Sequence, residues 1–322
     1  MRVFVAGASG AIGRRLVPQL IAAGHEVAGT FRTTGHDEQI RLLGAEPVEL
    51  DVLDARAVRR AVLLAQPDAI IHEATALANL RWSRSLDRSF AVTNRIRTEG
   101  TDALLAAARE AGVCRFVAQS FASHRYERAG SWVKSEDDPL DPSPPAAARQ
   151  TNAAMAHLDR AVTAAGGIAL RYGGFYGPGN DGFASMVRKR QYPIIGDGAG
   201  VTSWIHLDDA AAATVLALDH DGPAIYHIVD DEPAPMREWL PVFADVLGAR
   251  RPWRAPAWLA ALIAGGAMTA MATQSRGASN ARAKRDLGWT LRYPSWREGF
   301  AAAYGPASPG ESASARRATA PM

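Results

Sequence analysis

Apolar and amphipathic segments alternate along the first half of the chain. Short apolar runs at residues 3–6, 26–31, 46–50, 69–72 and 114–118 predict buried strands, and stretches with helical spacing at 11–23, 39–43, 55–65 and 98–111 lie between them. Parallel strands that are joined by helices form a sheet covered on both faces. The pattern therefore predicts an α/β fold built on a doubly wound parallel sheet.

The second half of the chain is less regular. A proline-rich loop at 131–145 precedes a predicted helix at 147–165 and a strand at 168–172; a helix at 208–218, a strand at 224–229 and a helix at 236–247 follow. We expect residues 1–172 to form the sheet domain and 173–304 to form mainly a smaller C-terminal α/β substrate domain, with some later segments returning to the sheet. Residues 305–322, rich in Ser, Ala, Gly and Pro, are expected to be a disordered tail.

Glycines follow the first strand at once and predict a binding loop. They form a GxxGxxG pattern between the strand at 3–6 and the next helix. Glycine permits a tight turn and lets backbone N–H groups approach a pyrophosphate, and the helix N-terminus adds partial positive charge. This context is that of a Rossmann domain and predicts a dinucleotide cofactor. The predicted contacts are Gly7, Ser9, Gly10, Ala11, Ile12 and Gly13.

The end of the second strand bears on the choice of cofactor. An acidic residue there binds the ribose 2′-hydroxyl of NAD, whereas an arginine pairs with the 2′-phosphate of NADP. Arg32 occupies this place, so we expect NADP, with NAD as the alternative if Arg32 is only a solvated surface residue. Asp51, with Val52 beside it, is predicted to accept a hydrogen bond from the adenine amino group; the alternative is that Asp51 caps the following turn.

Further motifs follow in order along nearly the whole chain. They are Asp51-Val52, Ile71-His72-Glu73-Ala74, Asn94 through Gly100-Thr101 to Ala108, Phe116 to Ser120, Leu170-Arg171-Tyr172, Phe175 to Gly179, Trp204 to Asp209 and Leu287-Gly288-Trp289. With the glycine pattern, they resemble the extended short-chain dehydrogenase/reductase superfamily, specifically its NAD-dependent epimerase/dehydratase branch. The resemblance implies a nicotinamide across the carboxyl ends of the strands, a small-molecule substrate between the domains, and cofactor contacts from Glu73, Ala74 and Asn94.

The chain departs from the family pattern at the catalytic helix. Members usually carry Tyr-x-x-x-Lys before the Leu-Arg strand, where the tyrosine exchanges a proton and the lysine lowers its pKa and holds the nicotinamide ribose. Here the segment from Ala146 to His157 contains neither residue. None of the chain's lysines lies four residues after a tyrosine: Lys134, Lys189 and Lys284.

Other residues near the expected nicotinamide end can carry a proton instead. We take Ser120 and Tyr126, after the fifth strand, and Tyr172, in place of the family's usual proline, as catalytic candidates. Ser123 and His124 are weaker candidates. For the serines the alternative is a hydroxyl bonded to local backbone.

The predicted function is an NAD(P)-dependent oxidoreductase or epimerase-like enzyme that acts on a small organic substrate with a carbonyl or hydroxyl group. Two alternatives stay open. One is a non-catalytic NADP(H)-binding sensor or scaffold, and the other is an isomerase or cyclase that retains its cofactor. Only the first hypothesis predicts that turnover can consume cofactor.

Composition argues against several other classes. The net charge of +3 arises from 36 basic and 33 acidic residues without a block of like charge, so we expect no nucleic-acid partner. The uncharged stretch Ala255–Ala272 is too short and too rich in Ala and Gly for a membrane span, and is predicted to be a buried or pocket-lining helix. Cys114, the only cysteine, is expected to be a small buried residue and indicates a reducing, cytoplasmic location. No metal-ligand spacing is present, and a homodimer stays open.

Overall fold

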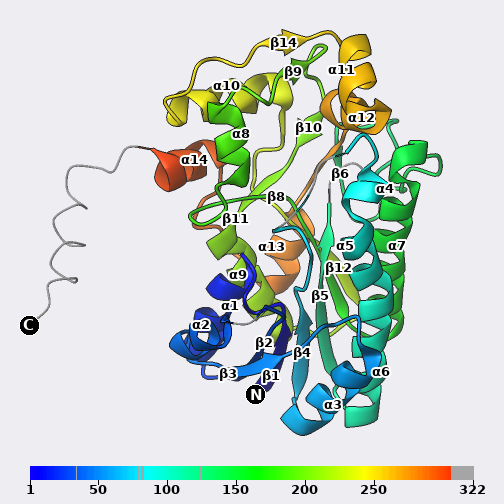
Figure 1. Ribbon diagram of the computed structural model, residues 1–322, viewed down its shortest axis with the longest axis vertical. Coiled ribbons are helices and arrows are strands. Elements are labelled where there is room, and N and C mark those ends of the chain that lie inside the picture. The colour runs from blue at the N-terminus through cyan, green and yellow to red at the C-terminus, as the bar shows by residue number, and fades with distance from the viewer. Residues whose placement is uncertain (34, 79, 81–82, 123–124, 306–322) are drawn as a thin grey trace, which may run out of the picture.

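The computed structural model describes residues 1–33, 35–78, 80, 83–122 and 125–305. At its centre lies a parallel sheet in the order β12-β7-β5-β4-β1-β2-β3 (Figure 1). This order confirms the predicted doubly wound sheet. The strands are β1 (Arg2–Ala6), β2 (Glu26–Phe31), β3 (Glu46–Glu49), β4 (Ala69–His72), β5 (Arg115–Phe121), β7 (Ile168–Tyr172) and β12 (Ala224–Ile228).

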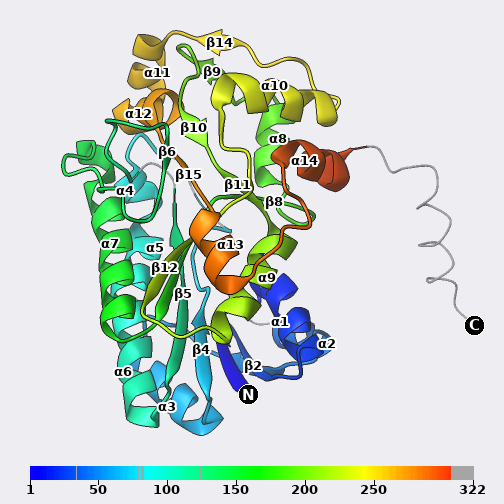
Figure 2. The same cartoon turned by 180° about the vertical axis from the view of Figure 1, so that it is seen from behind.

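Helices cover both faces of this sheet (Figures 1 and 2). In β1, Val3 and Val5 point into one helical layer and Phe4 and Ala6 into the other, and all four are fully buried. A strand that is buried on both faces reads as a continuous apolar run, which is why the pattern located these strands. The first layer holds α1 (Gly13–Ala22), α2 (Asp37–Leu42), α9 (Leu207–Leu218) and α13 (Ala281–Leu287), and the second holds α3 (Ala55–Ala65), α6 (Thr101–Ala111) and α7 (Arg149–Ala164).

A second apolar core lies beyond the carboxyl ends of the strands. Trp239 and Phe243 of α10 (Met236–Val246) pack against Trp296 and Phe300 of α14 (Trp296–Tyr304), and the ring centroids of Phe243 and Phe300 are 4.4 Å apart. Small sheets join this part: β8 (Gly174–Tyr176) with β11 (Trp204–His206), β9 (Ile194–Ile195) with β14 (Arg254–Ala255), β10 (Val201–Thr202) with β13 (Ala234–Pro235), and β6 (Val133–Lys134) with β15 (Gly277–Ala278). Ala184 and Val187 of α8 (Gly182–Arg188) also belong to this core.

Two stretches of chain differ from the prediction. Residues 86–100 form α4 (Leu86–Ser89), α5 (Ala91–Arg95) and a π-helical turn η1 (Ile96–Gly100), so the helix predicted from residue 98 begins at Thr101. The uncharged stretch is two helices, α11 (Ala257–Ala264) and α12 (Gly266–Gln274), and α11 leaves Trp258 66% exposed. The prediction of a buried or pocket-lining helix is therefore wrong for α11, whereas Ala267, Ala270 and Met271 of α12 line a small cavity. Gly265, whose φ of 90° suits glycine, separates the two helices.

Cys114 is exposed, so the expectation of a buried thiol is wrong. It precedes the first residue of β5 and follows Gly112, which ends α6 in the left-handed region with a φ of 71°. Cys114 lies just before the amino end of this central strand, and the apolar run becomes core only from Phe116 onward. In the described part of the chain, no helix is long and apolar enough to cross a membrane. The tail predicted from residue 305 lies outside the described residues from 306 onward.

Candidate dinucleotide and substrate site

The glycine loop lies where the strand order reverses. β1 has β2 on one side and β4 on the other, and the helices after β1 and β4 cover opposite faces. Such switch points open a crevice at the carboxyl ends of the strands, which is where ligands of open α/β sheets bind. The loop is tied to both neighbours: the Gly7 N–H donates to Thr30 Oγ1 of β2 at 2.9 Å, and the Glu73 N–H donates to the Ala6 carbonyl at 2.8 Å.

Glycine is needed at each of the three positions of the loop for a different structural reason. Gly7 has a φ of 98°, and a Cβ there would lie 2.7 Å from the backbone nitrogen of Ala74. A Cβ on Gly13 would collide with the carbonyl oxygen of Gly7, so glycine lets α1 pack closely on the loop. A Cβ on Gly10 would meet only the Gly7 carbonyl, at 3.1 Å, and Gly10 is exposed. Space therefore remains above Gly10 for a ligand.

The start of α1 offers unpaired donors beside this space. No side chain caps α1, and within the described part of the chain no group accepts a hydrogen bond from the N–H of Ala11 or Ile12. Free N–H groups at a helix N-terminus form an anion site. The loop therefore fits a pyrophosphate.

Tyr172 and Glu73 meet on the α1/α9 face of the sheet. Tyr172 is fully buried, and its hydroxyl lies 2.8 Å from Glu73 Oε1 and 2.6 Å from Thr214 Oγ1. Burial raises the pKa of Glu73 to about 8, although the hydrogen bond with Tyr172 opposes this. Glu73 is therefore protonated at neutral pH, and its second oxygen is buried without a described partner.

The inward face of α7 carries Thr151, Met155 and Asp159 at four-residue intervals, all buried. The start of α7 lies nearest the carboxyl ends of the strands (Figure 1). Thr151 is in the first turn and Met155 is one turn further along, and we call these two buried residues the inward pair. The Thr151 hydroxyl donates to Asp87 Oδ1 at 2.9 Å and accepts from Asn94 Nδ2 at 3.1 Å. Its proton is therefore committed to a carboxylate.

Asp159 joins two buried arginines on the α7 face of the sheet. Its Oδ2 accepts from Arg125 at 2.8 Å and from Arg171 Nε at 2.9 Å. Arg125 also donates to Ser120 Oγ at 3.1 Å, and Ser120 is only 1% exposed. Sequence reasoning singled out neither Asp159 nor Arg125, because nothing local marks an acidic residue on a helix as the partner of a distant strand.

Tyr126 continues this network to β12. Arg171 donates to its hydroxyl at 2.6 Å, and the same hydroxyl contacts His227 Nε2. His227 Nδ1 faces the Ser279 carbonyl at 3.2 Å, which can only accept, so Nδ1 carries the proton and Nε2 accepts from Tyr126. Burial lowers the pKa of His227 to about 3, with Arg171 adding to the effect, so this ring is neutral.

Comparison with known proteins agrees with this geometry. The family model described as the NAD dependent epimerase/dehydratase family matches residues 3–229. A 3-diazoavenalumate denitrifying reductase from Streptomyces sp is 43% identical over 310 residues, which is 93% of this chain and 99% of that protein. This chain belongs to the NAD-dependent epimerase/dehydratase family.

Solved structures share the fold of this family member. Thermus thermophilus UDP-glucose 4-epimerase in complex with NAD superimposes with a TM-score of 0.70 at 24% identity, covering 94% of this chain and 97% of that one. A human epimerase family protein with NADPH gives a TM-score of 0.73 at 20% identity, covering 94% and 99%. With the family established, the chain is an NAD(P)-dependent enzyme of the oxidoreductase or epimerase type, and its glycine loop fits a nicotinamide dinucleotide.

Three of the other predicted cofactor residues, Arg32, Asp51 and Val52, lie just beyond the carboxyl ends of β2 and β3. Arg32 is exposed at the end of β2, and Val52 is buried after β3. Asp51 Oδ1 accepts from the Leu53 N–H at 3.0 Å, so one of its oxygens caps the turn. Asn94 is 8% exposed with its amide nitrogen on Thr151. Ser123 and His124 lie outside the described residues.

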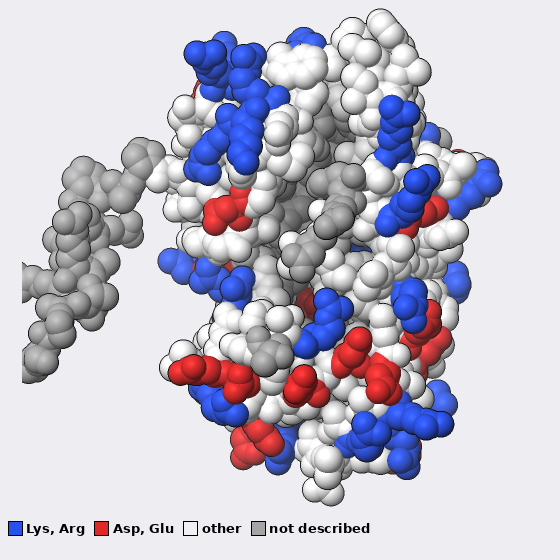
Figure 3. Space-filling view, viewed as in Figure 1, with Lys and Arg blue, Asp and Glu red and all other residues white. Residues whose placement is uncertain are grey.

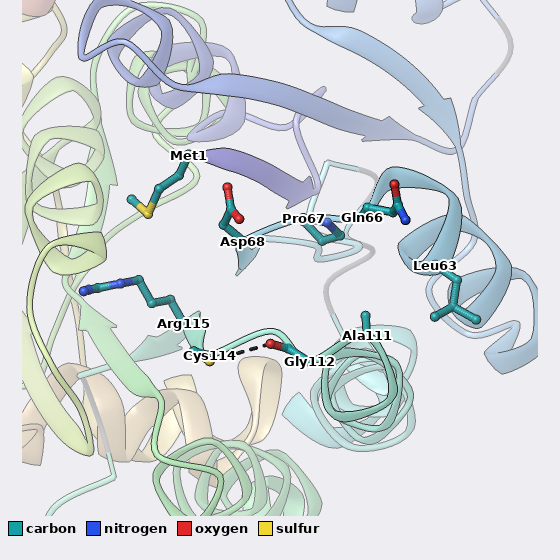
Figure 4. Close-up of a pocket in the computed structure, with 9 residues that line it drawn as sticks. All are labelled: Met1, Leu63, Gln66, Pro67, Asp68, Ala111, Gly112, Cys114 and Arg115. Atoms are coloured by element: carbon teal, nitrogen blue, oxygen red, sulfur yellow. Dashed lines mark hydrogen bonds between the residues drawn. The ribbon is translucent and has the colours of Figure 1, made fainter.

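A large surface pocket lies at the amino ends of the strands, opposite the glycine loop. Its volume is about 550 Å³, and Met1, Asp68, Cys114 and Arg115 line it beside the end of α6 (Figure 4). Met1 and Arg115 adjoin the amino ends of β1 and β5, away from the glycine loop. Since family ligands bind at the carboxyl ends, this pocket is not the candidate site. Among the described residues, no cluster of His, Cys, Asp and Glu can hold a metal ion.

Proposed function

We propose that this enzyme is an NADPH-dependent reductase that transfers hydride to the carbon bearing a diazo group and releases dinitrogen. The observation that carries the proposal is the inward pair on α7. Met155 has no exchangeable proton, and the Thr151 hydroxyl donates to Asp87. Carbonyl reduction needs an acid for the developing alkoxide, whereas loss of dinitrogen does not. The 43% identical relative, named as a diazo compound's denitrifying reductase, supports this choice.

The reaction balances without a protein proton. When bound, the reduced nicotinamide supplies a hydride: a C–H bond forms at the carbon of R–N₂⁺, the C–N electron pair leaves with N₂, and the cofactor becomes oxidised. The protein then has to bind the cofactor and the substrate, orient them toward each other and exclude water. We propose that the N–H groups of Ala11 and Ile12 and the glycine loop hold the pyrophosphate. Arg32 pairs with a 2′-phosphate, which makes NADPH the preferred cofactor.

The buried side chains have supporting roles in this proposal. Glu73, kept neutral by burial, and Tyr172 hold the crevice wall behind the glycine loop. Asn94 and Thr151 fix the first turn of α7 against Asp87. Met155, which is fully buried one turn further along, adds no exchangeable proton. The proposed reaction needs no proton donor at the nicotinamide end, because loss of dinitrogen leaves no alkoxide to protonate.

A second candidate function is reduction of a carbonyl compound with Tyr126 as the acid. It is favoured by one observation: Tyr126 lines a small cavity of about 20 Å³ beside α4 and α12, and Arg171 donates to its hydroxyl. Against it, the phenol proton points to His227 rather than into the cavity.

The test combines two isotopes. Purified enzyme receives a ¹⁵N-labelled arenediazonium salt with NADPH deuterated at either the pro-R or the pro-S position of C4, and headspace ¹⁵N₂ and product deuterium are measured by mass spectrometry. We expect enzyme-dependent N₂ and transfer of one of the two C4 hydrogens only. Release of N₂ no faster than in enzyme-free solution, or with no stereochemical preference, would refute the proposal. A parallel panel of ketones tests the second candidate.

A further inference from the structure

The helix α11 turns its large apolar side chains away from the protein. Trp258, Leu262 and Ile263 are 66%, 62% and 64% exposed. The residue of this helix that is buried is the small Ala260, and all eight residues of α11 are uncharged. A surface helix of a globular protein normally turns its large apolar residues inward. Contiguous apolar side chains that face the solvent instead mark a surface that another molecule or a membrane covers.

Six cations adjoin this apolar surface. All six are exposed, and in the described part of the chain none of them forms an ion pair: Arg188, Lys189, Arg190, Arg250, Arg251 and Arg254. We call these six residues the basic cluster. The acidic residues nearest to them in the chain, Asp181, Asp197 and Asp245, are fewer and pair with none of them. The basic cluster therefore has an excess of positive charge that no neighbouring carboxylate neutralises.

Backbone contacts hold the basic cluster beside α11. Arg254 of β14 pairs with Ile194 of β9, and α11 begins two residues after β14 ends. The Trp253 indole N–H donates to the Arg190 carbonyl at 3.2 Å, which ties residues 250–254 to the chain just after α8. Figure 3 shows Lys and Arg side chains over the end of the molecule where Figure 1 labels α8 and α10, and an uncharged surface over α11. The positive and the apolar surface thus lie at the same end.

We propose that α11 and the basic cluster bind the surface of a membrane that contains anionic lipids. In this arrangement α11 lies in the plane of the interface, its three exposed apolar side chains enter the boundary between head groups and acyl chains, and the basic cluster faces the lipid phosphates. Tryptophan suits this depth because its ring is apolar and its N–H is polar. The protein lies on the membrane without crossing it, since α11 has eight residues and a span needs about 20.

Charge and apolar character together favour a bilayer over other occupants of this face. A two-fold dimer places the same patch of each copy against the other, so the basic cluster would face itself. A nucleic acid would match the cations, but its phosphates offer no apolar partner to Leu262 and Ile263. An anionic bilayer supplies both the negative charge and the apolar layer. This surface requires neither cofactor nor substrate, so its failure would leave the proposed function untouched.

The first experiment measures vesicle binding by the full chain. Co-sedimentation at about 0.1 M salt compares vesicles of phosphatidylcholine alone with vesicles of equal parts phosphatidylcholine and phosphatidylglycerol. We expect roughly tenfold or tighter binding to the anionic vesicles, and loss of this preference at about 1 M salt, where exposed charges are screened. Binding to neither kind of vesicle, or equal binding to both, would overturn the proposal.

Paired variants locate the contact. Trp258→Ala combined with Leu262→Ala should weaken binding to anionic vesicles roughly tenfold or more, because two apolar groups no longer leave water. Arg250→Gln combined with Arg251→Gln should weaken it roughly tenfold through charge alone. The matched controls lie on one exposed stripe of α3, at the opposite end of the molecule in Figure 1: Leu64→Ala, and Arg56→Gln combined with Arg60→Gln. If the controls lose as much affinity as the variants at α11 and the basic cluster, the proposal fails.

A spectroscopic readout shows which side chain enters the lipid. Vesicles with brominated acyl chains quench the fluorescence of a tryptophan that they contact. Trp258→Phe should remove most of this quenching while it keeps vesicle binding, and circular dichroism checks that each variant keeps its fold. Unchanged quenching in Trp258→Phe would contradict the insertion of α11. A dimer in sedimentation velocity that Trp258→Ala dissociates, without vesicle binding, would assign this face to a second copy of the chain and overturn the proposal.

Discussion

Replacing Asp159 by asparagine should destabilise the protein more than any exposed charge substitution. Asp159 Oδ2 is shared by Arg125 and Arg171, and the side chains of all three residues are at most 5% exposed. Asparagine keeps the shape but leaves two like charges facing each other in the core. Breaking one buried pair costs about 3–5 kcal/mol, so we expect a loss of about 4 kcal/mol or more in the free energy of unfolding.

The assay is urea unfolding followed by far-ultraviolet circular dichroism, with a thermal melt beside it. For a chain of this size, about 4 kcal/mol corresponds to a fall in Tm of roughly 6–8 °C. The matched control is Asp102→Asn, which removes an exposed carboxylate that pairs with His157 at 2.8 Å. Exposed pairs contribute about 0–1 kcal/mol, so this variant should unfold almost like the unaltered protein.

The pH dependence adds a second readout. Burial raises the pKa of Asp159, but Arg125 and Arg171 outweigh it and hold the pKa below its usual value of 3.8. A folded-state pKa below the unfolded value means that the stabilisation is present above about pH 4 and is lost as the pH falls further. The difference between Asp159→Asn and the unaltered protein should therefore shrink below about pH 4. If the two Asp→Asn variants lose equal stability at neutral pH, the buried network is not what holds β5, β7 and α7 together.

Three further outcomes follow from the crevice. Gly10→Val should abolish calorimetric binding of both NADPH and NADH while the fold persists, since a Cβ there meets only the Gly7 carbonyl at 3.1 Å; undiminished binding would contradict the pyrophosphate site. Arg32→Ala should weaken NADPH binding roughly tenfold and leave NADH binding unchanged; equal losses for both would rule out pairing with the 2′-phosphate. In Glu73→Gln, stability should rise relative to the unaltered protein between about pH 4.5 and pH 8, because the folded pKa of about 8 lies above the unfolded value; parallel pH profiles in urea unfolding would show that Glu73 ionises normally.

Much of the fold follows from local sequence pattern. Strands such as 26–31 and 69–72 and the helix at 55–65 were predicted with the bounds that the structure shows, because a continuous apolar run or a helical stripe is encoded within one element. The short helices α4 and α5 were missed, since segments of four or five residues carry too little periodicity to stand out. Short strands such as β6 and β15 form only because they pair with each other across the fold, so no local sequence pattern predicts them.

Some features of the site are likewise evident from the sequence, and others depend on the fold. The glycine loop is determined by the sequence itself, because a tight turn and close packing each require glycine at a fixed spacing. The absence of tyrosine and lysine from α7 is also plain in the sequence. The sequence does not show which helical layer each side chain faces. Arg171 and Tyr172 are neighbours on β7 and point to opposite layers, Arg171 toward Asp159 and Tyr172 toward Glu73.

Only the tertiary structure decided which distant residues share a charge. Arg125 and Asp159 lie 34 positions apart, and Arg282 and Asp137, which also form an ion pair, lie 145 positions apart. Their meeting depends on strand register and on where α7 and α13 pack, and one residue of shift in either element would place other side chains there. The sequence by itself therefore specifies which elements form and where a diphosphate can lie. The fold decides which buried charges have partners.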